Sequence, residues 1–396
     1  MPIFADLHIH GKYSRAVSKN MLIPNLEKYA RIKGIGLLGT GDSQHPQWNA
    51  HLKEHLVKEK DGIYYTKIGF PFILSTEISL VYTQNEKGRR VHLILLFPSF
   101  SILEQFTAYL LSKGRIDYDG RPIFKIPSDV FVHDVKAISD TIEIIPAHIW
   151  TPWFSLFGSK SGFDTITACF GKETKHIYAL ETGLSSDPPM NWRLSQLDRF
   201  TLVSFSDSHS IYPWRIGREA TILDIPLTYA GLITALRTKK GYVGTVEVDP
   251  CYGKYHFDGH RKCAISMAPK KGQDTCPVCK KKMTIGVLHR VEELADRPNG
   301  YTPPNPALFH RVLPLHELIA VSVGQGVKTK KVQDIAQKLL SLAPELDILL
   351  TLPIEKIKKA ASSDIISLIL QNRKGQLAIE PGYDGEYGKI QLETHK

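Results

Sequence analysis

Histidines and carboxylates recur at the ends of short apolar runs in the first part of the chain. The first run leads to Asp6, His8 and His10, which alternate with Leu7 and Ile9. Because a strand sends alternate side chains to opposite faces, we expect Asp6 and the two histidines to share one face, with the apolar pair packed behind them. Together the run ends offer His8, His10, Glu77, His92, His148, Asp207 and His209, with Asp42 nearby.

This set of side chains suits divalent metals. One histidine on a strand is usually a core residue, but burying seven such groups unpaired would be costly. Mixed imidazole and carboxylate ligands suit Zn²⁺, Mn²⁺ or Fe²⁺, and so many ligands exceed one tetrahedral site. Closely spaced ions clamp the attacking and leaving oxygens of a phosphoryl centre and lower the pKa of a bound water. The residues therefore predict metal-assisted hydrolysis, with a phosphoester as the expected substrate.

The elements that position these groups are predicted to be buried strands. Seven short apolar runs meet this description, at residues 3–5, 34–38, 70–74, 91–97, 142–146, 177–180 and 202–205. Helical patterns include 22–33, 101–113, 191–198 and 227–239. Ligands at the C-terminal ends of successive buried strands are typical of a β/α barrel. The segment 84–88 predicts a hairpin turn between two strands, so we expect residues 1–247 to form an irregular α/β barrel.

The ligand motifs resemble, in chain order, those of the PHP (polymerase and histidinol phosphatase) domain. They are Asp6-Leu7-His8-Ile9-His10, Thr40-Gly41-Asp42, Glu77, His92, Pro146-Ala147-His148 and Ser206-Asp207-Ser208-His209. The resemblance implies a distorted seven-unit β/α barrel with a di- or trinuclear metal centre. It implies that His8, His10, Glu77 and Asp207 bind one metal, that Glu77 bridges to a second metal on His92 and His148, and that Asp42 and His209 serve a third. Asp207, Glu77 and His209 are the residues expected to take part in the reaction.

Two departures from the PHP pattern weaken the third site. The second motif usually has Thr-Asp-His, where this chain has Thr40-Gly41-Asp42. A histidine usually follows the first motif, where this chain has Tyr13-Ser14-Arg15-Ala16. The number of catalytic metals therefore stays open at two or three. Asp6 is interpreted as a group that orients an imidazole or a bound water rather than as a ligand.

Residues 248–290 predict a small zinc-binding module. Cys276 and Cys279 form a C-x-x-C knuckle, and Cys263 lies upstream. Either His260 or Cys251 completes a tetrahedral structural site. The basic residues that flank the knuckle form either a solvated face or a phosphate contact.

Residues 291–396 predict a mainly helical C-terminal domain, with helical patterns at 308–324, 330–341 and 354–371. Glycines between the first two patterns resemble a helix–hairpin–helix element, which grips DNA phosphates through backbone amides. The expected DNA contacts are Gly324, Gly326, Lys328, Lys330 and Lys331. An ordinary glycine-containing helix turn is the alternative.

An aromatic segment follows His148, at Trp150-Thr151-Pro152-Trp153-Phe154-Ser155-Leu156-Phe157. It predicts either core packing over the barrel mouth or a stacking wall for an extruded or unpaired base.

Composition limits the partners and the compartment. The net charge of +10 favours a polyanionic partner. No apolar run reaches the roughly 20 residues that span a bilayer, and the N-terminus lacks a secretory signal. Five cysteines with one C-x-x-C suit a reducing compartment. We expect a cytoplasmic, nucleoid-associated monomer without a membrane partner.

Three regions resemble the endonuclease Q family over nearly the full length. They are the PHP-like barrel, the zinc module with Gly253-Lys254-Tyr255-His256 and Gly259-His260-Arg261-Lys262-Cys263, and a C-terminal region with Leu313-Pro314-Leu315-His316-Glu317-Leu318 and Pro381-Gly382-Tyr383-Asp384-Gly385. Members of that family nick DNA on the 5′ side of deaminated bases (uracil, hypoxanthine, xanthine) and of abasic sites. The resemblance implies a DNA repair endonuclease that flips the damaged base into a pocket and uses two or three divalent metals (Zn, Mn or Mg).

Two other functions remain as alternatives. A small-molecule phosphomonoesterase of the histidinol phosphatase type would use the same barrel but needs neither the zinc module nor the C-terminal domain. A DNA-binding module with an inactive barrel would be expected to have lost ligands. A sliding clamp stays open as a further partner, although the tail has no convincing clamp-binding motif.

Overall fold

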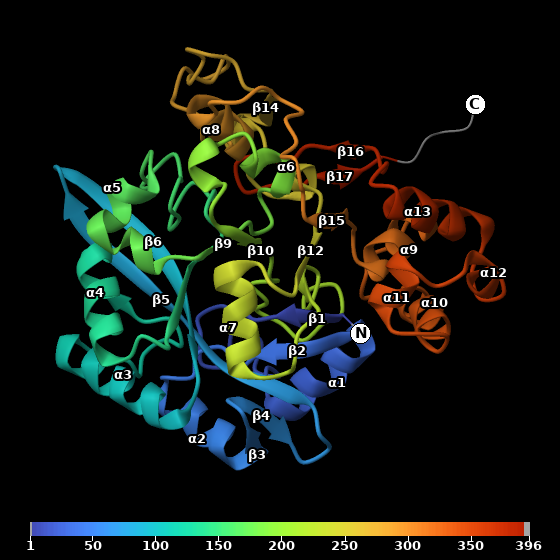
Figure 1. Cartoon of the computed structure of the whole chain (residues 1–396). Helices are drawn as coiled ribbons and strands as arrows, with labels where there is room; N and C mark the ends of the chain where they lie inside the picture. Colours follow the sequence, from blue (N-terminus) through green and yellow to red (C-terminus); the bar gives the residue numbers. More distant parts are fainter. Residues whose placement is uncertain (1, 392–396) are drawn as a thin grey trace.

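Seven strands form a distorted barrel in the computed structural model, which describes residues 2–391 (Figure 1). In chain order they are β1 (Ile3–Asp6), β2 (Ile35–Gly39), β5 (Pro71–Gln84), β6 (Lys87–Phe97), β8 (Glu143–Pro146), β9 (Ala179–Glu181) and β10 (Thr201–Val203). Strands β1, β2 and β5 are parallel, as are β9 and β10, whereas β6 runs antiparallel to both β5 and β8. The seven predicted strands are therefore confirmed, and the reversed β6 is what distorts the barrel.

Backbone hydrogen bonds close the barrel at the rim that carries the ligands. The amide of Ile149, beyond β8, donates to Glu181 O of β9. The amide of His10, beyond β1, donates to Ser208 O, beyond β10. The predicted hairpin between β5 and β6 is also present, with Gln84 paired to Lys87 and positive φ at Asn85 and Glu86. Two residues with positive φ are the geometry of a tight hairpin turn whose twist matches the strands.

Helices cover the outside of the barrel, and one helix covers the end opposite the ligand-bearing rim. The outer helices include α1 (Ile23–Lys33), α2 (Pro46–His55), α3 (Phe100–Lys113), α4 (Ser128–Ile138) and α5 (Ile166–Phe170). Helix α7 (Tyr229–Thr238) packs Leu232 and Leu236 against the interior cluster that contains Ala5, Leu37 and Val203 (Figure 1). This apolar interior fills the barrel, so the polar side chains gather at its opposite rim.

Further strands extend the barrel sheet on both sides. Strands β11 (Ala220–Leu223) and β12 (Tyr242–Glu247) follow β1, and β15 (Leu308–Arg311) pairs in parallel with β12. On the other side, β3 (Leu56–Lys60) and β4 (Ile63–Thr66) form an edge, and β7 (Ile123–Phe124) pairs with β5. These strands lacked the long apolar runs that identified the barrel strands.

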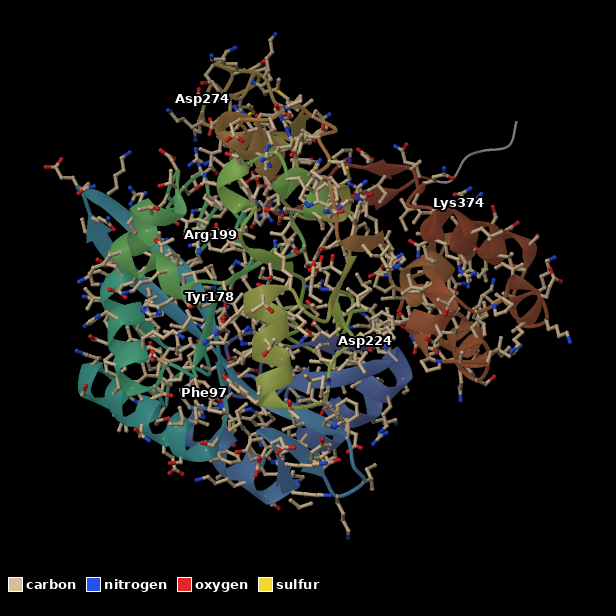
Figure 2. The ribbon with its side chains drawn as sticks, in the orientation of Figure 1. Phe97, Tyr178, Arg199, Asp224, Asp274 and Lys374 are labelled. Atoms are coloured by element: carbon tan, nitrogen blue, oxygen red, sulfur yellow. The ribbon has the colours of Figure 1, made fainter. Side chains whose placement is uncertain are left out.

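Two smaller regions attach to the barrel, marked in Figure 2 by Asp274 and Lys374. The first contains β13 (Asp258–His260), β14 (Ile265–Met267) and α8 (Val287–Leu294). The second contains α9 (Leu315–Val323), α10 (Lys330–Leu340), α11 (Glu345–Leu350), α12 (Ile354–Ile357) and α13 (Ser363–Arg373) around its own apolar cluster. None of the helices within residues 2–391 is long and apolar enough to cross a membrane.

The C-terminal segments return to the first small region. A short hairpin joins β16 (Ile379–Glu380) to β17 (Lys389–Ile390). Between these strands, Asp384 accepts hydrogen bonds from the amide of Arg261 and the hydroxyl of Thr284. The helical region is fixed to the barrel by Lys33, whose buried ammonium donates to Glu345 Oε1 at 2.6 Å and to Pro213 O at 2.8 Å. Domain boundaries at 247 and 290 stay a prediction.

Three predicted helices were wrong in their extent. The pattern at 308–324 becomes helical only at Leu315, because residues 308–311 pair with β12 and Pro314 starts the helix. The pattern at 354–371 is split into α12 and α13. In place of the predicted helix at 191–198, the chain forms α6 (Pro188–Asn191) and a separate 3₁₀ turn (Ser195–Leu197). Between them, Asp296 accepts hydrogen bonds from the amide and hydroxyl of Ser195.

Candidate metal centre

Two groups of ligand side chains meet at the rim of the barrel. The first consists of His8, His10, Glu77 and Asp207, and the second of Glu77, His92 and His148; within each group the ligand atoms lie within 4.8 Å of one another. Glu77 Oε1 lies 2.7 Å from His92 Nδ1 and 3.2 Å from His148 Nε2, and its Oε2 lies 3.6 Å from His8 Nε2. Glu77 thus contributes one oxygen to each side, which is the arrangement that a bridging carboxylate requires.

The residues present fit a bound metal. Within the described residues, His8 Nε2 is buried and has no hydrogen-bond partner, although it points into the first group. An unpaired buried nitrogen costs free energy unless something coordinates it. The other ring nitrogen, Nδ1, lies 2.9 Å from Glu181 Oε1, which orients the ring so that Nε2 faces the first group.

Asp42 and His209, the expected third-site residues, lie on different sides of His10. Asp42 Oδ1 accepts from His10 Nδ1 at 3.1 Å, and its Oδ2 accepts from the amide of Gly11 and the hydroxyl of Ser14. The His209 ring packs 4.5 Å from the His10 ring and is one-third exposed. Asp42 therefore orients His10 from behind, whereas His209 lies at the mouth of the site.

Asp6 does not join the other two residues of its motif. Strand β1 ends at Asp6, so the expected alternation stops there, and Leu7 and Ile9 pack in two different apolar clusters. The Asp6 carboxylate accepts from the amides of Ser206 and Gly217. Burial raises the pKa of Asp6 to about 6. It supports the loop that carries Asp207, which corrects the expectation that it orients an imidazole, and its role toward a bound water stays a prediction.

Two residues of the site were missed in the sequence. Glu181 follows a predicted strand, and its carboxylate binds both His8 Nδ1 and the amide of His148. Arg121 lies in a loop, and its Nη1 donates to Glu77 Oε2 at 2.9 Å. The position of Glu181 at a strand end was a usable signal, whereas nothing local distinguishes Arg121 from other surface arginines.

Charges within the site set the protonation of its groups. Burial opposes the charged form of His8, but Glu181, Glu77 and Asp207 outweigh it and hold the pKa of His8 above its usual value. Burial likewise opposes ionisation of Asp207, but His209 and His8 hold its pKa below the usual range. Burial opposes ionisation of Glu77 as well, but His92, Arg121 and His8 hold its pKa below the usual range. Both carboxylates of the first group are therefore ionised at neutral pH.

The backbone is strained at three of the predicted ligands. Asp42, His148 and Asp207 have φ values of 48°, 29° and 47°, which side-chain-bearing residues rarely adopt. Such conformations cost about 1–3 kcal/mol each and persist where the surrounding fold requires them. Gly183 makes one of them possible, because a Cβ at this position would lie 2.6 Å from His148 Cβ.

The departure in the second motif also has a backbone cause. Gly41 has φ of 60°, and a Cβ there would lie 2.2 Å from Ile9 O. The aspartate of the family's usual Thr-Asp-His would therefore collide with the first motif. Asp42, one residue later, reaches His10 from this tight turn.

The aromatic segment divides between the two predicted roles. Trp150, Leu156 and Phe157 are buried in the main core. Phe154 is half-buried and lies 4.7 Å from the His92 ring, and Trp153 contacts Tyr255 of the first small region. Among the aromatic residues of this segment, Phe154 is therefore the one that contacts a predicted metal ligand.

The structure gathers the zinc-knuckle residues with His260 as the fourth. His260, Cys263, Cys276 and Cys279 offer ligand atoms within 4.8 Å of one another. Cys251 lies elsewhere, with its Sγ 3.5 Å from His256 Nε2. Of the two alternatives for the fourth ligand, the geometry favours His260. The lysines that follow the knuckle, 280–282, are exposed.

The glycine turn of the C-terminal region is exposed and faces the metal-binding loop. Gly324 ends α9 with φ of 64°, and a Cβ at Gly324 or Gly326 would meet nothing within 4 Å. Lys330 and Lys331 are exposed at the start of α10. Lys328 Nζ lies 5.3 Å from the Tyr212 ring centre, three residues beyond His209. The amides of Gly324 and Gln325 donate to carbonyls of the last turn of α9, so the turn presents its exposed lysines rather than free amides.

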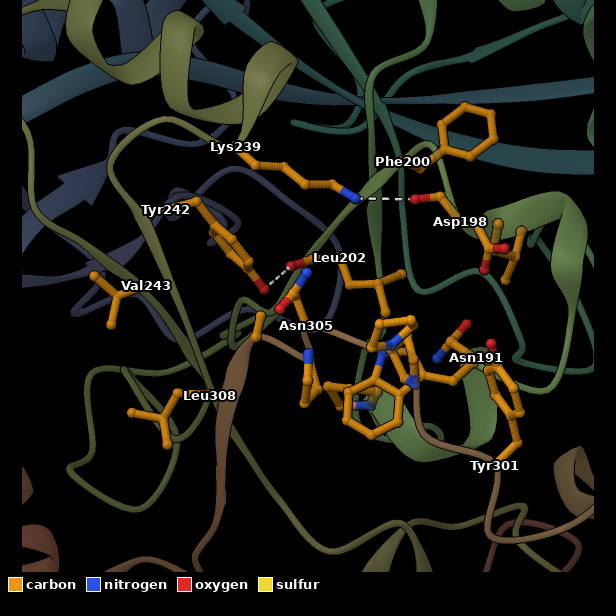
Figure 3. Close-up of a pocket in the computed structure, with 17 residues that line it drawn as sticks. Asn191, Asp198, Phe200, Leu202, Lys239, Tyr242, Val243, Tyr301, Asn305 and Leu308 are labelled. Atoms are coloured by element: carbon orange, nitrogen blue, oxygen red, sulfur yellow. Dashed lines mark hydrogen bonds between the residues drawn. The ribbon is translucent and has the colours of Figure 1, made fainter.

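A pocket of about 550 Å³ lies at the other end of β10 (Figure 3). Phe200, Leu202, Lys239, Tyr242 and Tyr301 are among its lining residues. Lys239 Nζ donates to Asp198 O, and Tyr242 Oη donates to Leu202 O. Because Asp207 follows the C-terminal end of β10, this pocket lies on the opposite side from the metal centre, where barrel residues generally serve stability.

Comparison with known proteins covers the full length of the chain. Residues 314–376 match the model of the MJ0043 C-terminal domain. The uncharacterized protein MJ0043 of Methanocaldococcus jannaschii is 30% identical over 73% of this chain, which spans 36% of that protein, and YqxK of Bacillus subtilis is 29% identical over 98% of this chain and 99% of its own length.

Two crystal structures resemble the whole fold. One is the lesion-specific endonuclease PfuEndoQ from Pyrococcus furiosus, with 31% identity, coverage of 100% of this chain and 96% of that chain, and a TM-score of 0.89. The other is endonuclease Q in complex with a 27-mer duplex that has an abasic lesion at the active site, with 31% identity, coverage of 100% and 97%, and a TM-score of 0.90.

Proposed function

The chain belongs to the endonuclease Q family, and we propose that it hydrolyses the DNA phosphodiester on the 5′ side of deaminated bases (uracil, hypoxanthine, xanthine) and abasic sites. The observation that carries the proposal is the pair of ligand groups that share Glu77 beside an ionised Asp207. Paired sites of this kind are suited to in-line displacement at phosphorus.

The metal ligands proposed are His8, His10, Glu77 and Asp207 for one ion and Glu77, His92 and His148 for a second. Zn²⁺, Mn²⁺ or Mg²⁺ bound there would activate water and neutralise the phosphate. Asp207, half-buried beside His10, would orient the attacking water through its free oxygen. His209 at the mouth would exchange a proton with the leaving oxygen. A third ion would need Asp42 to give up its contacts to Gly11 and Ser14, so two ions are the better supported number.

Duplex DNA is the proposed partner. The exposed turn at Gly324 and Gly326, together with Lys328, Lys330 and Lys331, would hold the backbone without reading sequence. The knuckle with its structural zinc on His260, Cys263, Cys276 and Cys279 would add basic contacts. Phe154 and Trp153 would stack on the extruded lesion, since damaged or mispaired bases cost less to unstack. The protein would act as a monomer.

The test compares end-labelled duplexes that differ at one position. Each duplex contains uracil, hypoxanthine, an abasic site or the normal base, and each is incubated with Mn²⁺, Mg²⁺ or Zn²⁺ and resolved by denaturing electrophoresis. A single nick 5′ of each lesion is expected, with the undamaged duplex intact. Equal cutting of all four duplexes would contradict lesion specificity.

A phosphomonoesterase of the histidinol phosphatase type is not favoured. Its barrel needs no zinc module and no helical region, whereas the likeness to endonuclease Q extends over the whole chain. Turnover of a small phosphomonoester without nicking would revive that alternative. An inactive DNA-binding barrel is disfavoured because both ligand groups are complete.

A further inference from the structure

Arg121 places a permanent positive charge beside both ligand groups of the rim. Its Nη1 donates at 2.9 Å to Oε2 of Glu77, the carboxylate that the two groups share. Burial is the main cause of the lowered pKa of His92 and of His209, and the Arg121 charge acts in the same direction on both. The guanidinium therefore lies near the second group and near the mouth of the site. Within residues 2–391, Arg121 is the one lysine or arginine that is ion-paired with a ligand of either group.

The loop that carries Arg121 is held against the first ligand motif. Asp119 Oδ1 accepts from the amide of Arg121 at 3.0 Å, which ties the turn together. A Cβ at Gly120 would lie 2.2 Å from Ser14 Oγ and 2.3 Å from Asp42 Oδ2, so only glycine lets the loop approach this closely. The backbone of Arg121 is thus fixed relative to the ligands before any substrate binds.

Arg121 has donors that the protein does not use. Its Nη1 is bound to Glu77, whereas its Nε and Nη2 make no hydrogen bond within the described part of the chain. The side chain is 25% exposed, so these donors are open to a ligand at the rim. A guanidinium presents its N–H groups in a planar fork that matches the oxygens of a phosphate.

The position of Glu77 indicates which phosphate these donors would meet. A phosphate that faces both ligand groups also faces Glu77, which belongs to both, and so comes within reach of the guanidinium bound to it. In reactions at phosphorus, catalysis comes mainly from positioning and from stabilising charge on the phosphate oxygens. A fixed cation in a partly buried site does this more effectively than one in water.

We propose that Arg121 is a catalytic residue, whose free guanidinium donors bind a non-bridging oxygen of the phosphodiester that is cut. This inference rests on the proposed function and adds a residue to its reaction. Water gives its oxygen to phosphorus and releases a proton, and the leaving oxygen departs with the electron pair of the broken P–O bond and takes up a proton. Arg121 exchanges no proton and forms no bond, and it holds the phosphate and stabilises its negative charge.

The first test locates the contact by removing the charge of one phosphate at a time. Wild type and Arg121→Gln are compared by fluorescence anisotropy in Ca²⁺, under conditions in which electrophoresis shows the duplex to be uncut. The abasic duplexes are unmodified, or have one uncharged methylphosphonate at the linkage 5′ of the lesion or at a linkage several nucleotides away. The variant should bind the unmodified duplex about 10-fold more weakly.

The loss in affinity should depend on the position of the methylphosphonate. It should disappear when the linkage 5′ of the lesion is uncharged and persist when the distant linkage is uncharged. An equal loss on all three duplexes would overturn the proposal, because Arg121 would then not touch the phosphate that is cut. If wild type cuts no lesion duplex but the loss still depends on this one linkage, the phosphate contact stands and only the proposed cleavage fails.

The second test separates catalysis from support of Glu77. Single-turnover nicking by Arg121→Gln at saturating metal and DNA should fall by about 10²-fold, and Arg121→Lys should recover part of the rate because it keeps the charge without the fork. Metal affinity, measured by calorimetric titration of the metal-free protein, should not fall, because a cation is removed from beside the site. Weaker metal binding with a rate that recovers fully at high metal would overturn the proposal.

Arg115→Gln is the matched control, because Arg115 lies in the same loop with its guanidinium exposed and paired with Asp117 at 3.0 Å. This variant should nick and bind like wild type. A loss similar to that of Arg121→Gln would trace the effect to net charge and overturn the proposal. Melting temperatures verify that each variant is folded.

Discussion

The barrel rim and the zinc knuckle both gather metal ligands, but from very different lengths of chain. The knuckle uses residues 260 to 279, held together by a tight turn in which the amide of Lys280 donates to Cys276 O. The rim uses residues 8 to 207, which lie in or just beyond strands β1, β5, β6, β8 and β10. A local site can form wherever its short segment folds, whereas the rim exists only when the whole barrel has closed.

The surroundings of the two clusters differ in the same way. In the first rim group only Asp207 is partly exposed, and Glu181, Asp42 and Arg121 hold the ligands from outside the group. In the knuckle only Cys276 is buried, and the thiols depend on their own turn. The supporting carboxylates Glu181 and Asp42 belong to the rim, which is what a reaction centre needs and a structural ion does not.

Loss of a rim ligand should have the largest effect. Asp207→Ala removes an ionised carboxylate of the first group, so nicking of an abasic duplex should fall by at least about 10³-fold while duplex binding stays within a few fold. Single-turnover kinetics and anisotropy measure the two quantities. A fully active variant would mean that the assignment of Asp207 is wrong.

Removing support for a ligand should have a smaller effect. Glu181→Gln weakens the hold on His8 Nδ1, so metal affinity should fall by about 10- to 100-fold, measured by calorimetric titration of the metal-free protein. Glu143→Gln is the control, because this buried carboxylate binds Arg237 on the opposite side of the barrel. Equal metal affinity in both variants would show that Glu181 only fills space.

Loss of the structural zinc from the knuckle should leave the metals of the rim in place. Cys276→Ser and His260→Ala should each lower the metal content by one zinc per chain, measured by mass spectrometry, and expose residues 261–282 to protease. Nicking of a chromophore-labelled abasic duplex at saturating concentration should fall by about 10-fold or less, because the rim keeps its metals. Cys251→Ser should retain the zinc, and loss of zinc in that variant would reverse the choice of fourth ligand.

The smallest effect concerns the pH dependence of barrel stability. Glu247 Oε2 accepts from Thr182 and Ser204 hydroxyls, and burial raises the pKa of Glu247 to about 8. A carboxyl with a raised folded-state pKa loses stabilising protonation as pH rises from about 4.5 to about 8. Glu247→Gln should therefore gain stability over wild type across this range, by at most about 1.4 kcal/mol per pH unit.

Thermal unfolding at pH 5, 6.5 and 8 checks this expectation. The melting temperature of the variant minus that of wild type should become more positive as pH rises. A constant difference would show that Glu247 stays charged in the folded barrel.

Local sequence patterns were sufficient to predict those elements whose signature lies within one short segment. Short buried strands have a recognisable apolar signature, so all seven barrel strands could be predicted, and so could the hairpin between β5 and β6. The C-x-x-C spacing likewise defined most of the knuckle, because its ligands share one turn. The order of the motifs was enough to indicate the two ligand groups that share Glu77.

Non-local pairing decided the rest. Residues 308–311 have a helical pattern but become β15, because an edge of β12 is available to them. Arg121 has no signature of its own, and only the fold brings its guanidinium to Glu77. The choice between His260 and Cys251 depended on which side chain the chain path brings to three thiols.

The sequence by itself therefore determined which residues can bind metals and which strands carry them. The tertiary structure alone decided what each polar group faces. Asp6 was expected beside the imidazoles, but the end of β1 turns it to the amides of Ser206 and Gly217. The reason is physical: a side chain's type and period are local properties, whereas the partners of Asp6 are 200 and 211 residues away and are placed only when the barrel closes.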